Sequence, residues 1–375
     1  MMNFDQTSYV PVLRWKQGEK SGLNWLSEAA KTRTRPLIEL IPPNFKKPDG
    51  KSKDPKAAVR LIAEEVDEYW GQSPIFIDLK NVLEAGIESR RNQPHMLELL
   101  FESSNRIRPL FPNTSALIPV IWLDASIEYR EAVRAVIEDE GIGACIRITE
   151  QNIGEVKFAT RLEQTLTNLG TEIQDCDLVV DLQVIAASPT SLKDILSAVP
   201  QLSKWKTLTL TAGSFPSDLQ EYEKDNVYQI ARGEWFYYRE QTQLLSEGIR
   251  MPIYGDYTVQ HAIYREPPDH CNPSASIRYA HENYWVLMRG HGLTHKGSLK
   301  NDQYPAEAQL LCSMDEFCGE EFSLGDKYIA QSWKCGKKGN PMTWIRAGIN
   351  HHMEFASSQV AEFAKTSEVQ RKKTA

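Results

Sequence analysis

Four carboxylates stand at the ends of short apolar runs in this sequence. They are Glu39 in LIEL, Asp78 in IFIDLK, Asp181 in LVVDLQ and Asp256 in PIYGD. Hard divalent cations prefer carboxylate oxygens, so these four side chains could hold such a cation if the fold brought them together. Lys80, at the end of the same run as Asp78, and Arg147, in a further run, could then neutralise a phosphate or carboxylate. One hypothesis is therefore a metal-dependent hydrolase or phosphodiesterase-type enzyme acting on a phosphorylated or nucleotide substrate.

The elements that would position these residues follow an alternating pattern. Short runs rich in Val and Ile alternate with amphipathic segments, which is typical of parallel strands covered by helices. The predicted strands are residues 9–14, 36–41, 74–79, 116–123, 144–149, 177–183, 207–211 and 252–257. Eight such units match the usual size of a (β/α)8 barrel. A doubly wound open sheet is the alternative, but WKQGE after the first strand is not its usual glycine-rich phosphate turn.

The rhythm changes after the eighth predicted strand. The stretch REPPDHCNPSAS at residues 265–276 is rich in Pro, Asp, Asn and Ser and indicates a boundary or excursion. A strand-like segment at residues 277–288 follows, and the remainder is mainly helical in pattern. We therefore predict an α/β fold with a TIM-barrel-like domain at residues 1–260, a C-terminal extension packed on it at residues 261–364, and a flexible tail at residues 365–375.

In such a barrel, the carboxyl ends of the strands share one functional face. We therefore expect the candidate catalytic residues to meet there, and the basic end of the first strand, Arg14 and Lys16, to join them. The candidates are Glu39, Asp78, Lys80, Arg147, Asp181 and Asp256. Opposite charges at a barrel mouth can also simply pair with one another, because the same fold supports many functions. The sequence contains no HxH or HExxH metal motif, so it leaves open both catalysis and a bound divalent cation.

A basic loop after the second strand is a second candidate site. Its sequence, PNFKKPDGKSKDPK, supplies Lys46, Lys47, Lys51 and Lys53, and Arg90 and Arg91 lie in the next strand-to-helix loop. These cations could clamp an anionic ligand or an acidic partner surface. The alternative is an ordinary solvated loop.

Two aromatic segments are candidates for partner binding. Trp235, Tyr237 and Tyr238 lie in EWFYYRE, and Trp344 and Arg346 lie in MTWIR. Trp, Tyr and Arg dominate protein-binding surfaces, although packing in the core explains the same residues. The adjacent His351 and His352 would point to different faces of a helix, so the pair could not easily bind one metal. One histidine could act as a general base with Asp256 or Glu354, although histidines with a purely structural role are more common.

Composition narrows the class of protein. The chain has 375 residues, of which 41% are hydrophobic and 25% charged, as in globular proteins. Its formal net charge of -7 argues against broad nucleic-acid binding, although local patches stay possible. The six cysteines form no CxxC pair, which favours reduced thiols. With no signal peptide or membrane helix in the pattern, we expect a cytoplasmic protein.

Longer stretches from the beginning, middle and end of the chain carry a family resemblance. They are YVPVLRWKQGEKSGLNWL with the following RPLIELIP, PIFIDLK, ARGEWFYYRE and GNPMTWIRAGINHHMEF. Together they resemble the Beta protein family of phage satellites and bacterial genomes. The resemblance implies a barrel-like phage-defence or immunity protein that binds and restrains a toxic or effector partner encoded nearby. It implies no catalytic residues.

Overall fold

The fold is taken from a computed structural model of the whole chain. It describes residues 4–46, 50–51, 53–71, 73–87, 95–107, 117–246, 248–266, 272–294 and 299–374, with the side chains of the last helix described up to residue 367.

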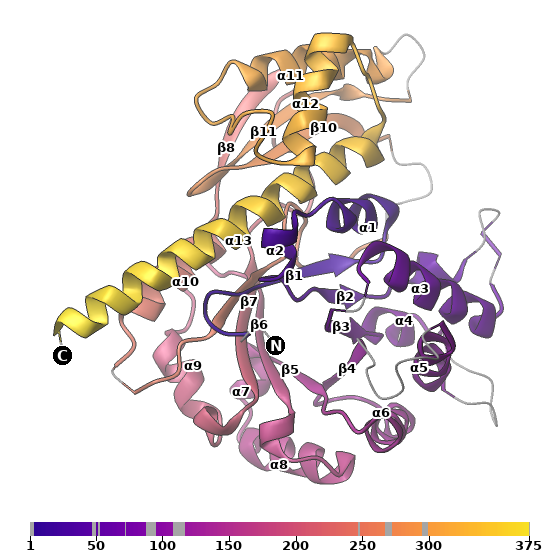
Figure 1. Cartoon of the computed structure of the whole chain (residues 1–375), viewed down its shortest axis with the longest axis vertical. Coiled ribbons are helices and arrows are strands. Elements are labelled where there is room, and N and C mark those ends of the chain that lie inside the picture. The colour runs from indigo at the N-terminus through magenta and orange to yellow at the C-terminus, as the bar shows by residue number, and fades with distance from the viewer. Residues whose placement is uncertain are drawn as a thin grey trace.

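Eight parallel strands close into a barrel in the order β1-β2-β3-β4-β5-β6-β7-β9 (Figure 1). The strands are β1 (Tyr9–Arg14), β2 (Leu37–Glu39), β3 (Ile75–Asp78), β4 (Leu117–Trp122), β5 (Cys145–Thr149), β6 (Asp177–Val184), β7 (Thr207–Gly213) and β9 (Ile253–Asp256). Each lies where the sequence predicts a strand. The barrel closes through parallel pairing of β1 with β9, in which Val10 faces Gly255. The predicted TIM-barrel-like fold is therefore confirmed.

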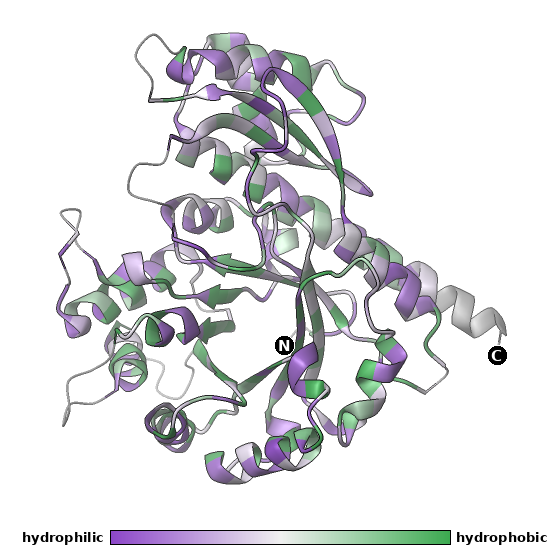
Figure 2. Cartoon of the chain, turned by 180° about the vertical axis from the view of Figure 1, so that it is seen from behind, coloured by the Kyte–Doolittle hydropathy of each residue, from purple (hydrophilic) through white to green (hydrophobic). Residues whose placement is uncertain are grey.

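Alternation along the strands fills the barrel with two kinds of layer. Inward-facing apolar residues, among them Val12, Leu37, Phe76, Cys145 and Val179, form one buried cluster inside the barrel. Successive side chains of a strand point to opposite faces, so the residue two positions later faces inward again. In five strands that next residue is charged: Arg14, Glu39, Asp78, Arg147 and Asp181. Figure 2 shows that the barrel strands consist mainly of hydrophobic residues, coloured green, and the charged residues follow the inward-facing apolar ones towards the carboxyl end.

Helices cover the outside of the barrel. They are α1 (Gln17–Asn24), α2 (Glu28–Lys31), α3 (Pro55–Tyr69), α4 (Lys80–Glu84), α5 (Met96–Ile107), α6 (Ile127–Glu140), α7 (Glu150–Ile153), α8 (Phe158–Leu169), α9 (Leu192–Ala198) and α10 (Gly233–Gln243). Helix α3 shows how the local sequence determines where such a helix begins and which of its faces is buried. The Asp54 side chain caps it by accepting a hydrogen bond from the Ala57 amide, and Val59, Ile62 and Val66 form its buried stripe.

A three-stranded antiparallel sheet of order β10-β11-β8 lies at one end of the molecule (Figure 1). It consists of β8 (Asn226–Ala231), β10 (Ser274–Ala280) and β11 (Tyr284–Gly292), with α11 (Tyr304–Cys312) and α12 (Leu324–Cys335) packed on it. The single strand predicted at residues 277–288 is in fact a hairpin, because the chain turns where the His281 amide donates to the Tyr284 carbonyl. Strand β8 was not predicted, and it pairs with β11 although it precedes residue 260.

The long helix α13 (Pro341–Thr374) joins the two parts. It runs from the three-stranded sheet along the side of the barrel, past α1 and α2 (Figure 1). Close approach needs glycine here, since a Cβ at Gly348 would lie 2.6 Å from the Arg278 carbonyl oxygen. The helical backbone includes residues 365–374, where the sequence predicts a flexible tail. Within the described residues, no helix has both the length and the apolar character needed to cross a bilayer.

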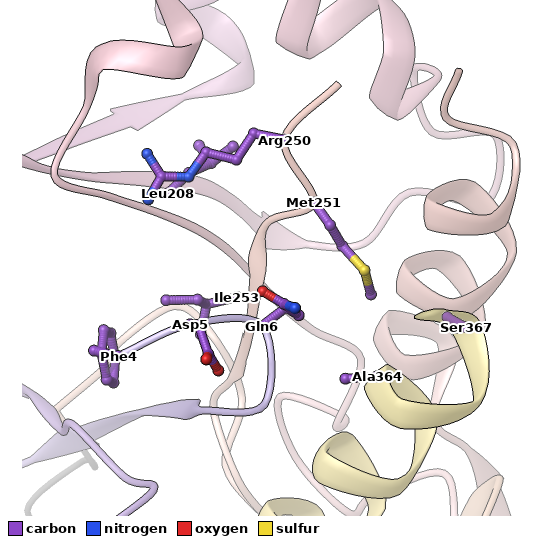
Figure 3. Close-up of a pocket in the computed structure, with 9 residues that line it drawn as sticks. All are labelled: Phe4, Asp5, Gln6, Leu208, Arg250, Met251, Ile253, Ala364 and Ser367. Atoms are coloured by element: carbon purple, nitrogen blue, oxygen red, sulfur yellow. The ribbon is translucent and has the colours of Figure 1, made fainter. Parts of the chain in front are cut away.

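A cavity of about 330 Å³ lies at the amino end of the barrel (Figure 3). The N-terminal segment with Phe4 and Asp5 forms one wall, and Met251, Ala364 and Ser367 form another. Functional residues of (β/α)8 barrels gather at the opposite, carboxyl end, while the amino end serves stability. The barrel mouth, and not this cavity, is therefore the candidate site.

Candidate functional site at the barrel mouth

Arg147 is the centre of the charged layer at the mouth. From β5 its guanidinium reaches across the barrel to three other strands. Nη1 donates to Asp78 Oδ2 at 2.7 Å, Nη2 donates to Glu39 Oε1 at 2.9 Å, and Nε and Nη2 donate to Asp181 Oδ2 at 3.0 and 2.7 Å. One planar cation thus binds three carboxylates, a geometry that suits the donor fork of arginine.

The carboxylates have further partners of their own. Asp181 Oδ1 accepts hydrogen bonds from Thr211 Oγ1 at 3.0 Å and from the Gln183 amide at 2.9 Å. Asp78 Oδ1 accepts from the Lys80 amide at 2.8 Å. Arg14 Nε lies 3.3 Å from Glu39 Oε2, so the basic end of β1 also belongs to this layer. The network is closed on itself, with few carboxylate oxygens left for another ligand.

Burial and neighbouring charges act in opposite directions on the pKa values of Asp78 and Arg147. Burial raises the pKa of Asp78, and the Arg147 cation opposes that rise. Burial also lowers the pKa of Arg147, but the surrounding Tyr257, Asp181, Glu39 and Asp78 outweigh it and raise that pKa well above its ordinary value. Arg147 therefore stays protonated and is the counter-ion of the acids.

A cavity of about 290 Å³ opens above this network. Lys80, Trp122, Asn152 and Gln183 contribute to its wall. Lys80 Nζ lies 3.8 Å from Glu84 Oε1, 4.0 Å from Asp124 Oδ1 and 5.6 Å from the centre of the Trp122 ring. Its side chain is 31% exposed, so Lys80 is a cation of the mouth that a solute can reach.

The predicted divalent-cation site has a different occupant. Glu39, Asp78 and Asp181 do converge, but the Arg147 guanidinium fills the position between them where a cation would bind. In the part of the chain that the structure describes, no three His, Cys, Asp or Glu side chains are placed to hold a metal ion. The alternative of internal charge pairing describes these residues.

Asp256, the fourth carboxylate, does not reach the mouth, and its predicted place there is wrong. It is the last residue of β9 and points outward, because the inward positions of that strand are Gly255 and Tyr257. Its carboxylate accepts hydrogen bonds from Tyr9 Oη at 2.5 Å, Tyr254 Oη at 3.0 Å and His352 Nε2 at 2.8 Å. These residues form an outer cluster between the barrel and α13.

The two adjacent histidines have separate partners: His352 belongs to the outer cluster, and His351 does not. His352 contacts Asp256, and Trp285 Nε1 donates to His352 Nδ1 at 3.4 Å. His351, on the other face of α13, contacts Asp326 Oδ2 at 2.9 Å and the Ala280 carbonyl at 2.8 Å. Both rings are fully buried. The expectation that they point to different faces is correct, and neither histidine can reach a solute as a general base.

The basic loop is only partly within the described residues. Lys46 Nζ forms an ion pair with Glu266 at 2.9 Å, and Lys53 Nζ donates to the Asn44 carbonyl at 3.0 Å. Lys51 is exposed. The other predicted ligand-binding residues, Lys47, Arg90 and Arg91, lie outside the described residues.

The aromatic candidates for partner binding lie in the core. Trp235, Tyr237, Tyr238 and Trp344 are all buried, and Trp235 packs edge-on against Tyr254. Arg346 lies half-buried, with its guanidinium 3.8 Å from the centre of the Trp25 ring. A partner cannot contact these four buried rings, so core packing is their role, whereas a partner contact at the half-buried Arg346 stays a prediction.

Two residues that matter for the candidate sites, Tyr257 and Trp333, were not predicted from the sequence. Tyr257 Oη accepts a hydrogen bond from Arg147 at 2.8 Å and donates to Asp181 at 2.7 Å, and the period-two alternation of β9 could have revealed its inward position. Trp333 on α12 is 42% exposed, whereas the other tryptophans are buried or half-buried. No sequence signal marks it, since its spacing of four from the buried Ile329 predicts burial.

Comparison with known proteins gives a consistent result across the chain. The family model described as Beta protein matches residues 9–358. A relative called Protein beta, from Enterobacteria phage P4, is 22% identical over 388 residues, and the alignment covers 93% of this chain and 93% of the relative. The match therefore includes both the barrel and the three-stranded sheet.

Proposed function

Because this chain belongs to the Beta protein family, we propose that it is a phage-defence or immunity protein that binds and restrains a toxic or effector partner encoded nearby. The proposal assigns it a binding role and no chemical turnover. Its partner is a protein, in keeping with a net charge of -7 that disfavours broad contact with nucleic acid.

The observation that carries this proposal is the closed network around Arg147. A catalytic acid or base must reach a substrate proton, directly or through one water. Asp78, Asp181 and Glu39 instead direct carboxylate oxygens at a buried guanidinium. Charges that are satisfied inside the protein in this way stabilise a scaffold, and the scaffold can present a binding surface.

Trp333 is the residue that we assign to the partner contact. A large exposed aromatic side chain on a helix offers much contact area, and tryptophan is enriched among residues that dominate binding energy. Phe322 and Met342, which flank α12 in the sequence, are also exposed. We place the partner surface on this C-terminal part of the molecule.

Co-purification with the products of neighbouring genes tests the proposal. We expect the tagged chain to retain one of these products, and Trp333→Ser to weaken that association at least about tenfold, as hot-spot residues do. The matched control is Val156→Ser, a fully exposed apolar residue on the barrel side, which should bind as the wild type does. No retained product, together with unchanged phage plating and toxicity after gene deletion, would refute the proposal.

The enzyme alternative is favoured by one observation, the mouth cavity with its accessible Lys80. If the mouth cleaves a phosphorylated or nucleotide substrate, Lys80→Ala should abolish turnover at a nearly unchanged melting temperature, because the contacts of the Lys80 side chain with Glu84, Asp124 and Trp122 are long. Asp78→Ala and Asp181→Ala cannot serve as clean tests, since both break the Arg147 network. A screen of phosphodiester and phosphomonoester substrates that detects no Lys80-dependent activity excludes this alternative.

A further inference from the structure

A small pocket lies where the barrel meets the three-stranded sheet. Its volume is about 120 Å³. Arg14 and Lys16 approach it from the end of β1, Tyr264 and Arg265 from the segment after β9, and Arg278 from β10. We call it the junction pocket. It is separate from the mouth cavity, with which it shares only the wall formed by residues 263 and 264.

The lining of the junction pocket is strongly cationic. Four of its side chains are Arg or Lys, and the carboxylate among its lining residues is the exposed Asp218, whose Oδ1 already accepts a hydrogen bond from the Gln220 amide. Arg14 is only 4% exposed, and Glu39 balances its charge in part. Among the described residues, no ion pair is formed by Lys16 or Arg278. The pocket therefore holds more positive charge than its own residues neutralise.

Donor groups at this pocket are also unused. Arg278 Nε and the Tyr264 hydroxyl are both shielded from solvent and have no hydrogen-bond partner among the described residues. The rest of the Arg278 guanidinium is fixed, because Nη1 donates to the Val259 carbonyl at 2.8 Å and the group lies 4.8 Å from the centre of the Phe215 ring. A buried polar group without a partner is costly, so its presence points to a missing acceptor.

Electrostatics supports the same conclusion. Burial lowers the pKa of Arg278 to about 10. Lys16 is exposed along part of its length, but desolvation of its ammonium group by the surrounding residues lowers its pKa. The nearby cations Arg14 and Arg278 act in the same direction, against the acids Glu19 and Glu266. Cations that destabilise one another in this way are stabilised by an anion placed between them.

We propose that the junction pocket binds the phosphate group of a small phosphorylated ligand through Arg14, Lys16 and Arg278. Phosphate suits the pocket because a dianion with several acceptor oxygens matches an excess of cations and the forked donors of arginine. The volume is that of about four water molecules, at ~30 Å³ each, which accommodates a phosphate group. The inference goes beyond the proposed partner binding and does not depend on it.

The test measures anion binding by the purified full-length chain alone. The melting temperature and the heat of binding are recorded with inorganic phosphate, pyrophosphate and ATP, and with acetate at matched ionic strength. We expect the phosphate compounds, and not acetate, to raise the melting temperature. Tighter binding of ATP than of pyrophosphate assigns the pocket to a nucleotide, whereas equal binding assigns it to the phosphate group alone. Equal stabilisation by acetate would overturn the proposal.

Two variants and a control connect binding to this pocket. Lys16→Gln and Arg278→Gln should each weaken phosphate binding by about tenfold to a hundredfold, the usual effect of losing a charged hydrogen bond. Arg134→Gln changes an exposed arginine on α6 and should bind within about twofold of the wild type. Lys16 is exposed, so its variant decides the question even if Arg278→Gln fails to fold. Wild-type affinity in Lys16→Gln would place the anion elsewhere.

Discussion

Replacing Arg147 with alanine is expected to lower the free energy of unfolding by about 3 to 5 kcal/mol near neutral pH, the usual effect of breaking a buried ion pair. The substitution removes the common partner of Glu39, Asp78 and Asp181, three acids buried at the mouth. A loss of this size is a large part of the ~5 to 15 kcal/mol by which folded domains are stable. Urea denaturation of the purified variant measures it.

The pH dependence of this variant identifies the cause. Burial raises the pKa of Asp78 in the folded state, and without the guanidinium nothing from Arg147 opposes that rise. The folded state then binds more protons than the unfolded state, so the variant should recover part of its stability as the pH falls from 8 to 5. Arg147→Lys should be intermediate, because one ammonium group cannot replace the guanidinium fork. The exposed Arg60→Ala should unfold at the wild-type urea concentration, and equal stability of Arg147→Ala and wild type would contradict this role.

The second large effect is expected at His352, which joins α13 to the barrel through Asp256. Against the effect of burial, His352 and Arg232 lower the pKa of Asp256 to about 2. A carboxyl group with a lowered folded-state pKa stabilises the protein above its ordinary pKa near 4, and the stabilisation is lost as the pH falls towards 2. Across this interval it is worth about 2 kcal/mol, since one pKa unit is ~1.4 kcal/mol. His352→Leu should remove most of this contribution and leave Asp256 short of a partner.

Whereas the pKa of a histidine in a surface ion pair is usually raised, the pKa of His352 is lowered. Burial lowers its pKa below the ordinary value of 6.5, so the unfolded state binds a proton first and stability falls as the pH drops below about 6.5. His95, whose pKa burial lowers to about 4, contributes in the same direction. Glu19 and Glu234, whose pKa burial raises to about 7, contribute in the opposite direction. The difference between the wild-type and His352→Leu curves isolates His352.

Unfolding curves between pH 3 and pH 8 provide this measurement. We expect the wild type to lose more stability than His352→Leu as the pH falls, so the two curves should converge in acid. His352→Gln, which keeps a side-chain amide as a donor to Asp256, should lie between them. Parallel curves for all three proteins would show that the His352–Asp256 contact contributes no pH-dependent stability.

The barrel could be predicted from the sequence because its strands are short, apolar and evenly spaced. The convergence of Glu39, Asp78, Arg147 and Asp181 followed from the same pattern, since strand ends of a barrel share one rim. Asp256 was misplaced because a shift of one residue moves a side chain to the other face of a strand. The sequence offered pairing of these charges only as an alternative to a cation site, because the outcome depends on how far the Arg147 side chain reaches across the barrel.

Other elements gave weaker signals. Strand β8, with the sequence NVYQIA, has mostly exposed or half-buried residues and lacks the apolar run of a barrel strand. The aromatic residues of α10 share a composition with binding surfaces, and only the packing of Trp235 against Tyr254 and Phe363 shows that they belong to the core. Composition alone does not show whether such aromatic residues lie in the core or on the surface.

Strand β8 also connects the two parts of the molecule, because the chain leaves the barrel to form this strand and then returns to the barrel. It lies between β7 and β9 in the sequence, yet its hydrogen bonds go to β11, more than fifty residues further on. A chain cut after the barrel would keep this strand but lose the neighbour that completes it, leaving an open edge of the kind that invites aggregation. We therefore expect a chain that ends after the barrel to aggregate through the exposed edge of β8.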